Sequence, residues 1–108
     1  MQRVVFGRLE VRLVWLAQEP MRPGGRYLVQ QAARRTLARI SEVHSRLDIA
    51  TLQEVTAEGG VGANDIVRAR LSLQAPLFVD AYESVHATGA LILIDEATNH
   101  TVAAGMVQ

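Results

Sequence analysis

Strict alternation of apolar and polar residues is the feature of this sequence that most restricts its fold. In the stretch 66–77, IVRARLSLQAPL, polar residues separate the apolar residues Val67, Ala69, Leu71 and Leu73. In the stretch 8–16, RLEVRLVWL, one face would carry Leu9, Val11, Leu13 and Trp15, and the other Glu10, Arg12 and Val14. Side chains of a strand point alternately to opposite faces, so both stretches predict a β-strand with one buried face. Pro76 cannot donate to a neighbouring strand, so we expect the later strand to end or reach an edge there.

Turn-forming residues separate these strands from others. A group of prolines and glycines after the first strand must end that strand: Pro20, Pro23, Gly24 and Gly25. They predict a turn before a short strand at 27–30. Further along, the stretch 56–65, TAEGGVGAND, is rich in glycine and predicts a loop. Near the C-terminal end, 90–94 (ALILI) is apolar throughout, as in a strand covered on both faces. Turn residues in 95–100 predict that this strand forms a hairpin with 101–107.

The stretch 30–47 fits two structures. It is rich in Ala, Arg and Leu, which favour helix. Helix-like spacing of three or four positions separates its apolar residues Leu37, Ile40, Val43 and Leu47. No strong cap and no C-terminal glycine supports a helix, however. We therefore predict a strand over about 36–47, with a bulge accommodated within it.

About six strands and no clear helix indicate an antiparallel sandwich or a small barrel. A closed barrel would also remove the exposed edges that such apolar strands otherwise offer for aggregation. The 108 residues contain no internal repeat and no change of composition. We therefore expect a single domain over 1–108, which is long enough for one core.

The composition excludes several kinds of chemistry. The chain has no cysteine, and all 11 of its basic residues are arginine. Disulfides, thiolate metal sites, a GxxxxGK[ST] phosphate loop and a catalytic lysine are therefore excluded. The formal net charge is zero, so the total charge calls for neither nucleic acid nor an anionic membrane. Without cysteine, a signal peptide or a long apolar run, we expect a cytoplasmic protein that does not span a membrane.

No residues group into a recognisable active site. His44, His86 and His100 are too far apart for a local metal motif, and no GxSxG sequence frames a serine. The glycine-rich stretch 59–65 contains no lysine, which a phosphate loop requires. We expect no catalytic, cofactor-binding or metal-binding residue in this chain.

The arginines are the remaining candidates for a binding surface. The candidate partner-docking residues are Arg34, Arg35, Arg39, Arg68 and Arg70. Arg68 and Arg70 should project from the same outer face, and a basic patch results if the two arginine-bearing strands are neighbours. Such a patch could bind a protein, phosphate or RNA. The alternative is a solvated strand face, balanced by the 11 acidic residues, and we favour it.

Four blocks of the sequence resemble a known family. They are PMRPGGRYLVQ (20–30), HSRLDIATLQ (44–53), GANDIVRARLSLQAPLFVDAYE (62–83) and ATGALILIDEATNHTVAAGMV (87–107). In order and spacing they are similar to the C-terminal domain of the large, GTP-binding subunit of bacterial sulfate adenylyltransferase. The last block is the most specific. That subunit looks like elongation factor Tu, with a GTPase domain followed by two β-barrels.

The resemblance implies a closed six-stranded antiparallel barrel with Greek-key character, in which this chain is the last barrel. It implies sulfate assimilation, in which the small subunit forms adenosine 5′-phosphosulfate from ATP and sulfate while GTP hydrolysis drives the step. GTP and Mg would belong to the GTPase domain, which these residues do not include. The implied partners are that domain, the middle barrel, the small subunit and, in some members, a fused adenylylsulfate kinase.

The sequence departs from the family at three places. Many relatives have an Asn-Arg pair where this chain has Val85 and His86, an asparagine at Ala50 and a phenylalanine at Leu91. A partner contact made through that Asn-Arg pair does not carry over. Two functions remain: a structural and docking barrel of the enzyme subunit, or a stand-alone barrel that binds protein or RNA. Zero net charge and few aromatic residues favour the first, and make nucleic acid an unfavoured partner.

Overall fold

A computed structural model describes residues 3–22, 24–31, 34–57, 60–79 and 89–108 of the chain. The strands in these ranges are β1 (Arg3–Val5), β2 (Arg8–Trp15), β3 (Arg26–Gln31), β4 (Arg34–Asp48), β5 (Gln53–Val55), β6 (Ile66–Leu73), β7 (Leu77–Val79), β8 (Ala90–Asp95) and β9 (Thr101–Val107). Every pairing between them is antiparallel.

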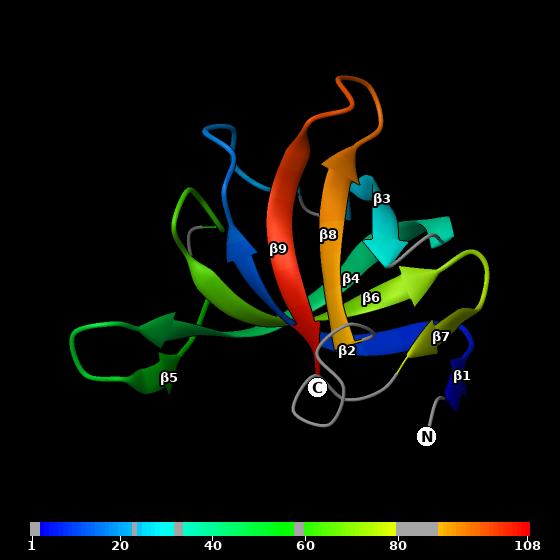
Figure 1. Cartoon of the computed structure of the whole chain (residues 1–108). Coiled ribbons are helices and arrows are strands. Elements are labelled where there is room, and N and C mark those ends of the chain that lie inside the picture. Colours follow the sequence, from blue (N-terminus) through cyan, green and yellow to red (C-terminus); the bar gives the residue numbers. More distant parts are fainter. Residues whose placement is uncertain (1–2, 23, 32–33, 58–59, 80–88) are drawn as a thin grey trace.

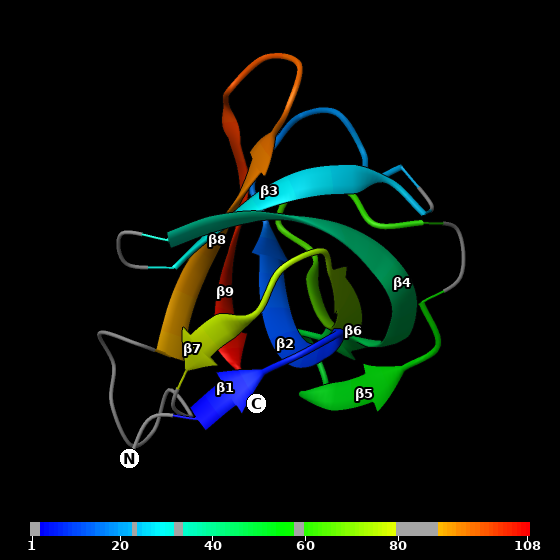
Figure 2. The same cartoon turned by 90° about the vertical axis from the view of Figure 1, so that its right-hand side faces the viewer.

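The larger sheet closes on itself (Figures 1 and 2). Its strand order is β3-β8-β9-β2-β6-β4, and an additional pairing of β3 with β4 completes the ring. β2 lies beside β6 although β3, β4 and β5 intervene in the sequence, which is a Greek-key connection. β5 extends β4 outside the ring, and β1 pairs with β7 in a small separate sheet. The expected closed six-stranded antiparallel barrel is confirmed.

The alternating residues of β2 and β6 line the barrel interior, as predicted. Their inward side chains are nearly all buried, and the outward ones of β2 and β6 are half-buried or exposed. Trp15 closes one end of the core and meets the ring of Tyr27 edge to face, with 5.6 Å between ring centroids. The residues of β2 and β6 that alternate with these buried ones lie on the outside of the barrel. The pattern of each strand therefore defines which face can bind a partner.

Most of the ambiguous stretch forms one long strand, β4, as predicted, and a bulge explains the three-residue spacing of Ile40 and Val43, whereas Leu37 and Leu47 are only half-buried. The register with β6 shifts between Ile40 and Glu42 and again between Val43 and Ser45. Each shift adds one residue and reverses the alternation, so apolar residues three apart can both face the core. Ile40 is buried, and Val43 packs against the core. The hydroxyl of Ser41, within the first bulge, donates to the Arg70 carbonyl at 3.1 Å.

The prediction that 90–94 is covered on both faces is confirmed at Ile94, which lies on the same side of β8 as Ile92 and is buried, but it is wrong for Ala90 and Ile92. Leu91 and Leu93 point into the core, whereas Ala90 and Ile92 are only half-buried. Each wall of a barrel has one solvent-facing side, so an apolar run need not mean two covered faces. The hairpin of β8 with β9 is confirmed, and so is the end of β6 before Pro76.

Three short strands were not predicted. β1, β5 and β7 have three residues each, too few to show an alternating pattern. β5 forms a hairpin with the end of β4 that projects from the side of the barrel, as Figure 1 shows on its left.

Candidate docking surface

The outward side chains of β2, β6 and β4, together with Glu54 of β5, form a continuous surface of mixed charge. In the ladder of β2 with β6, Glu10 lies opposite Arg70 and Arg12 opposite Arg68. We call this surface the charged face and define it by Glu10, Arg12, Glu42, His44, Glu54, Arg68 and Arg70. Glu10 and Arg70 attract one another across the ladder, whereas Arg12 and Arg68 are a like-charged pair, and Arg12 forms its ion pair with Glu54 instead.

Arg70 is held by two carboxylates. Its Nε donates to Glu10 Oε1 at 2.7 Å, and its Nη1 donates to Glu42 Oε2 at 3.2 Å. The hydrogen bond from Arg70 holds the pKa of Glu10 below its usual value; partial burial opposes this, and the bond with His44 reinforces it. The same bond with Glu10 raises the pKa of Arg70. These are charge-assisted hydrogen bonds, which fix Arg70 against the barrel wall.

His44 joins the same group of side chains. Its Nε2 lies 2.8 Å from Glu10 Oε2, and its Nδ1 lies 3.9 Å from Glu42 Oε1. Glu10 therefore bridges Arg70 and His44 across three strands. Sequence reasoning considered His44 as a metal ligand or an ordinary surface histidine and missed this contact with Glu10, because the strand order decides its neighbours.

A second network surrounds Glu54 on β5. Arg12 Nη2 donates to Glu54 Oε1 at 2.7 Å, and Ser45 Oγ donates to Glu54 Oε2 at 3.0 Å. The hydrogen bond from Arg12 lowers the pKa of Glu54. A second nitrogen of the Arg12 guanidinium, Nη1, is buried without a hydrogen-bond partner among the described residues. The network ties the projecting hairpin to the barrel wall.

Arg68 is the arginine of this face that keeps donors available. Its Nε donates to Ser45 Oγ over a long 3.4 Å, and it forms no ion pair within the described ranges. Its side chain is exposed, and it lines a surface hollow of about 440 Å³ together with Glu10, His44 and Gln108. Of the two arginines predicted on β6, Arg68 is therefore the one able to bind an acidic group of a partner.

The structure separates the predicted arginines into two places. The β4–β6 register puts Arg39 opposite Ser72, two pairs along from Glu42 and Arg70, so Arg39 borders the charged face. Arg34 and Arg35 lie at the other end of β4, opposite Gln31 and Gln30. Arg35 donates to the Gln30 amide oxygen at 2.9 Å. The strands are neighbours, as the patch required, but acidic residues lie between the arginines.

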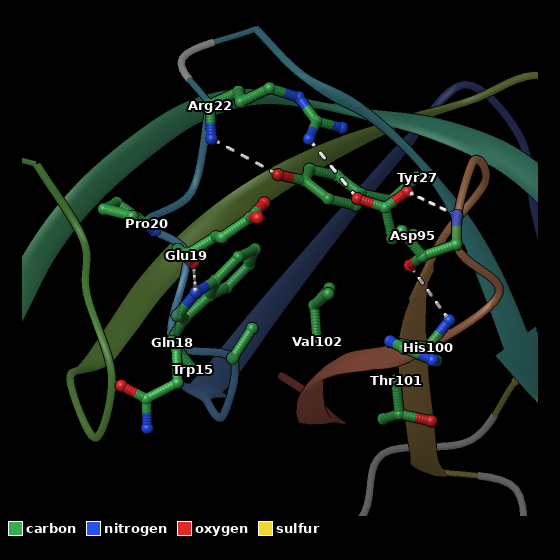
Figure 3. A pocket seen from close by; sticks show the side chains of 12 residues that line it. Trp15, Gln18, Glu19, Pro20, Arg22, Tyr27, Asp95, His100, Thr101 and Val102 are labelled. Carbon is green, nitrogen blue, oxygen red and sulfur yellow. Dashed lines mark hydrogen bonds and ion pairs between the residues drawn. The ribbon is translucent and has the colours of Figure 1, made fainter.

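A cavity of about 310 Å³ opens at one end of the barrel (Figure 3). Trp15 and Tyr27 form its floor, and the β2–β3 and β8–β9 connections supply its walls. The guanidinium of Arg22 lies over the Tyr27 ring, 5.1 Å from the centroid, and its Nη1 donates to Asp95 Oδ2 at 3.3 Å. Trp15 Nε1 donates to the Glu19 carbonyl at 2.8 Å.

Asp95 organises the wall of this cavity. Its Oδ1 accepts hydrogen bonds from the backbone N–H groups of Ala97 and Thr98, at 2.8 and 3.2 Å. These backbone bonds lower the pKa of Asp95, and Arg22 adds to the effect. The carboxylate thus caps the β8–β9 turn, which was predicted as a turn around Asp95 and Asn99. Among the described cavity residues, no hydroxyl donates to a histidine or carboxylate side chain, so the cavity shows no activated nucleophile.

In the described part of the chain, no three His, Asp or Glu side chains are grouped to hold a metal ion. No helix within the described ranges is long and apolar enough to cross a membrane. Val85 and His86, where the sequence departs from its relatives, lie outside the described residues.

The barrel and its connections define a class of protein. Residues 8–108 match the GTP-eEF1A C-terminal domain-like family, and the chain belongs to that family. Among its curated relatives, sulfate adenylyltransferase subunit 1 of Laribacter hongkongensis is 37% identical over 97% of this chain. The corresponding subunit of Teredinibacter turnerae is 35% identical over 97% of it. The bifunctional enzyme CysN/CysC of Rhodopirellula baltica is 39% identical over 92%. The resemblance predicted from the four blocks is confirmed.

The chain spans only 22% of the length of the first two relatives and 15% of the third. A solved structure of Sup35 complexed with GDP matches 98% of this chain with a TM-score of 0.84, and this chain covers 26% of it. The sequences are 18% identical, so this likeness shows the fold alone.

Proposed function

We propose that this chain is the C-terminal structural and docking barrel of a sulfate adenylyltransferase subunit 1, and that it catalyses no reaction itself. The observation that carries the proposal is 37% identity to such a subunit over 97% of the chain. The closed barrel and the absence of a phosphate loop from the sequence are consistent with a non-catalytic role.

In this role the barrel holds its neighbours in register. The GTPase domain of the parent subunit binds GTP and Mg, and its GTP hydrolysis is coupled to formation of adenosine 5′-phosphosulfate by the small subunit in the cytoplasm. The barrel contacts the GTPase domain, the middle barrel and the small subunit, and in fused relatives a kinase domain. The charged face supports docking because Arg68 offers guanidinium donors that no acidic residue in the described ranges occupies.

A chimaera tests the proposal. In subunit 1 of Laribacter hongkongensis, the matched segment is replaced by this chain, and co-purification with the small subunit is measured at increasing salt. We expect the chimaera to assemble. We expect Arg68→Glu to weaken assembly at low salt, with a smaller loss at high salt because ions screen the contact.

Arg35→Glu is the matched control, since it makes the same change of charge at the opposite end of β4 from the charged face. Equal effects of the two variants at every salt concentration would remove the charged face from the docking surface. A folded chimaera that never binds the small subunit, while the unmodified Laribacter subunit does, would refute the proposed function itself.

A further inference from the structure

Two large aliphatic side chains are exposed at the tip of the β4–β5 hairpin. Ile49 is 64% exposed and Leu52 is 74% exposed, within the turn of residues 49–52. The hairpin projects from the barrel, and both views show β5 outside the ring of strands (Figures 1 and 2). We call these two side chains the hairpin knob. Large aliphatic residues in an exposed turn need a reason, because polar residues and glycine serve the turn better.

The backbone of Leu52 gives a second, independent reason to expect a partner. Its φ is +59°, in the left-handed region. A bulky residue is uncommon there because its Cβ approaches the following carbonyl oxygen, whereas glycine or asparagine adopts this conformation readily. Leu52 therefore costs stability through its backbone and also exposes an apolar side chain. Both costs fall on one residue of an isolated turn, and strain of this kind is concentrated at functional sites.

The turn holds the knob in a defined position. The N–H of Leu52 donates to the Asp48 carbonyl at 2.6 Å, and the N–H of Ala50 donates to Asp48 Oδ1 at 2.9 Å. The ion pair of Glu54 with Arg12 fastens the returning strand to the barrel. A hollow of about 350 Å³, lined in part by Ile49, Val55 and Asp65, lies beside the knob. The outer edge of β5 pairs with no other strand among the described residues. A rigid knob beside a hollow and an open edge is suited to binding a protein surface.

We propose that the hairpin knob inserts into an apolar recess on another domain of the same polypeptide. This inference rests on the proposed function, which makes the barrel one part of a longer subunit. Two side chains bury far less than the roughly 1,200 Å² typical of a stable interface between separate proteins, so a dimer of this chain is not the occupant. Within one polypeptide, the linkage supplies a high effective concentration, and a small contact is sufficient.

Hydrogen exchange tests the contact directly. Amide exchange of residues 49–53 is measured in the free chain and in the Laribacter chimaera. We expect exchange at the turn to be at least roughly tenfold slower in the chimaera, because the contact between the knob and its recess must open before these amides exchange. Ile49→Ser combined with Leu52→Asn should remove this protection. Leu16→Ser changes another exposed aliphatic residue, outside the hairpin, and should leave it unchanged.

Leu52→Asn in the free chain separates docking from folding. Asparagine tolerates the left-handed conformation, so we expect a Tm equal to or higher than that of the unmodified chain. A lower Tm would mean that Leu52 serves the barrel's own stability, and would overturn the inference. Unprotected turn amides in a chimaera whose other barrel segments gain protection would also overturn it, and would leave the proposed function standing. If no barrel segment gains protection, the docking function fails as a whole.

Discussion

Arg68 and Arg70 are two residues apart on β6 and point to the same side of it, yet their surroundings differ. Arg70 is half-buried and forms ion pairs with Glu10 and Glu42. Arg68 is exposed and has one long hydrogen bond to a serine. Reversing the charge at Arg70 therefore tests how this residue stabilises the barrel. Reversing it at Arg68 tests partner binding.

We predict that Arg70→Glu lowers the Tm of the free chain more than Arg68→Glu does. The new carboxylate of Arg70→Glu would face Glu10 and Glu42 without a cation between them, and like charges at cross-strand positions are destabilising. Thermal melts followed by circular dichroism measure both variants. Adding Glu10→Arg to Arg70→Glu should recover part of the loss. Equal melting temperatures for the two single variants would contradict the ion-pair assignment.

Asp95 makes the stability of the barrel depend on pH. Its pKa is lowered in the folded barrel from the ordinary 3.8, because backbone N–H groups and Arg22 stabilise the carboxylate. A lowered pKa means that this stabilisation is fully present above pH 3.8 and is lost as the pH falls through the folded-state pKa below it.

We therefore expect Asp95→Asn to lower the Tm most at neutral pH. The difference from the unmodified chain should shrink as the pH falls below about 3.8, where protonation removes the charge of Asp95. Thermal melts from pH 7 to pH 2.5 in steps test this. A constant difference across that range would mean that the carboxylate charge contributes nothing.

At the scale of the strands, Gly105 lets β9 pass close to its neighbours. A Cβ at this position would lie 2.7 Å from Leu13 Cδ2, 2.9 Å from Leu91 Cδ1 and 3.2 Å from the Arg12 carbonyl oxygen. Leu13 and Leu91 belong to the buried core and have little room to move. The glycine is thus required by packing inside the barrel.

We predict that Gly105→Ala reduces the free energy of unfolding by about 1–3 kcal/mol, the usual cost of overpacking a core. Gly62→Ala is the matched control, because a Cβ there meets nothing within 4 Å. Urea denaturation measures both variants. Equal stability of the two would show that the leucines can move aside and that the strands are less tightly packed than the distances indicate.

At the scale of the whole molecule, the barrel holds its charged face, end cavity and projecting hairpin on one framework. We predict that the purified chain neither hydrolyses GTP nor forms adenosine 5′-phosphosulfate, because the sequence has no phosphate loop or catalytic lysine. Release of phosphate from GTP and of pyrophosphate from ATP with sulfate measure the two reactions. Turnover that persists through successive purification steps would contradict a purely structural role.

The sequence alone was sufficient to predict the strands, and their buried faces, where every second residue is apolar. In β2 and β6 each inward residue is apolar, so burial follows from the two-residue period and needs no knowledge of the neighbouring strand. The terminal hairpin followed from its turn residues for the same local reason. The sequence blocks also identified the family, which implied the closed barrel.

Tertiary structure decided what depends on neighbours. The bulges of β4 are irregularities in its pairing with β6, and the first of them lets Ile40 and Val43, three residues apart, both face the core. The partners of Arg70 come from β2 and β4, so no local pattern could show that this arginine is neutralised while Arg68 is available. The positive φ of Leu52 arises where the hairpin closes between Asp48 and Gln53. Alternation within a strand is a local property of the chain, whereas charge pairing, register and turn geometry depend on which strands the closed barrel places side by side.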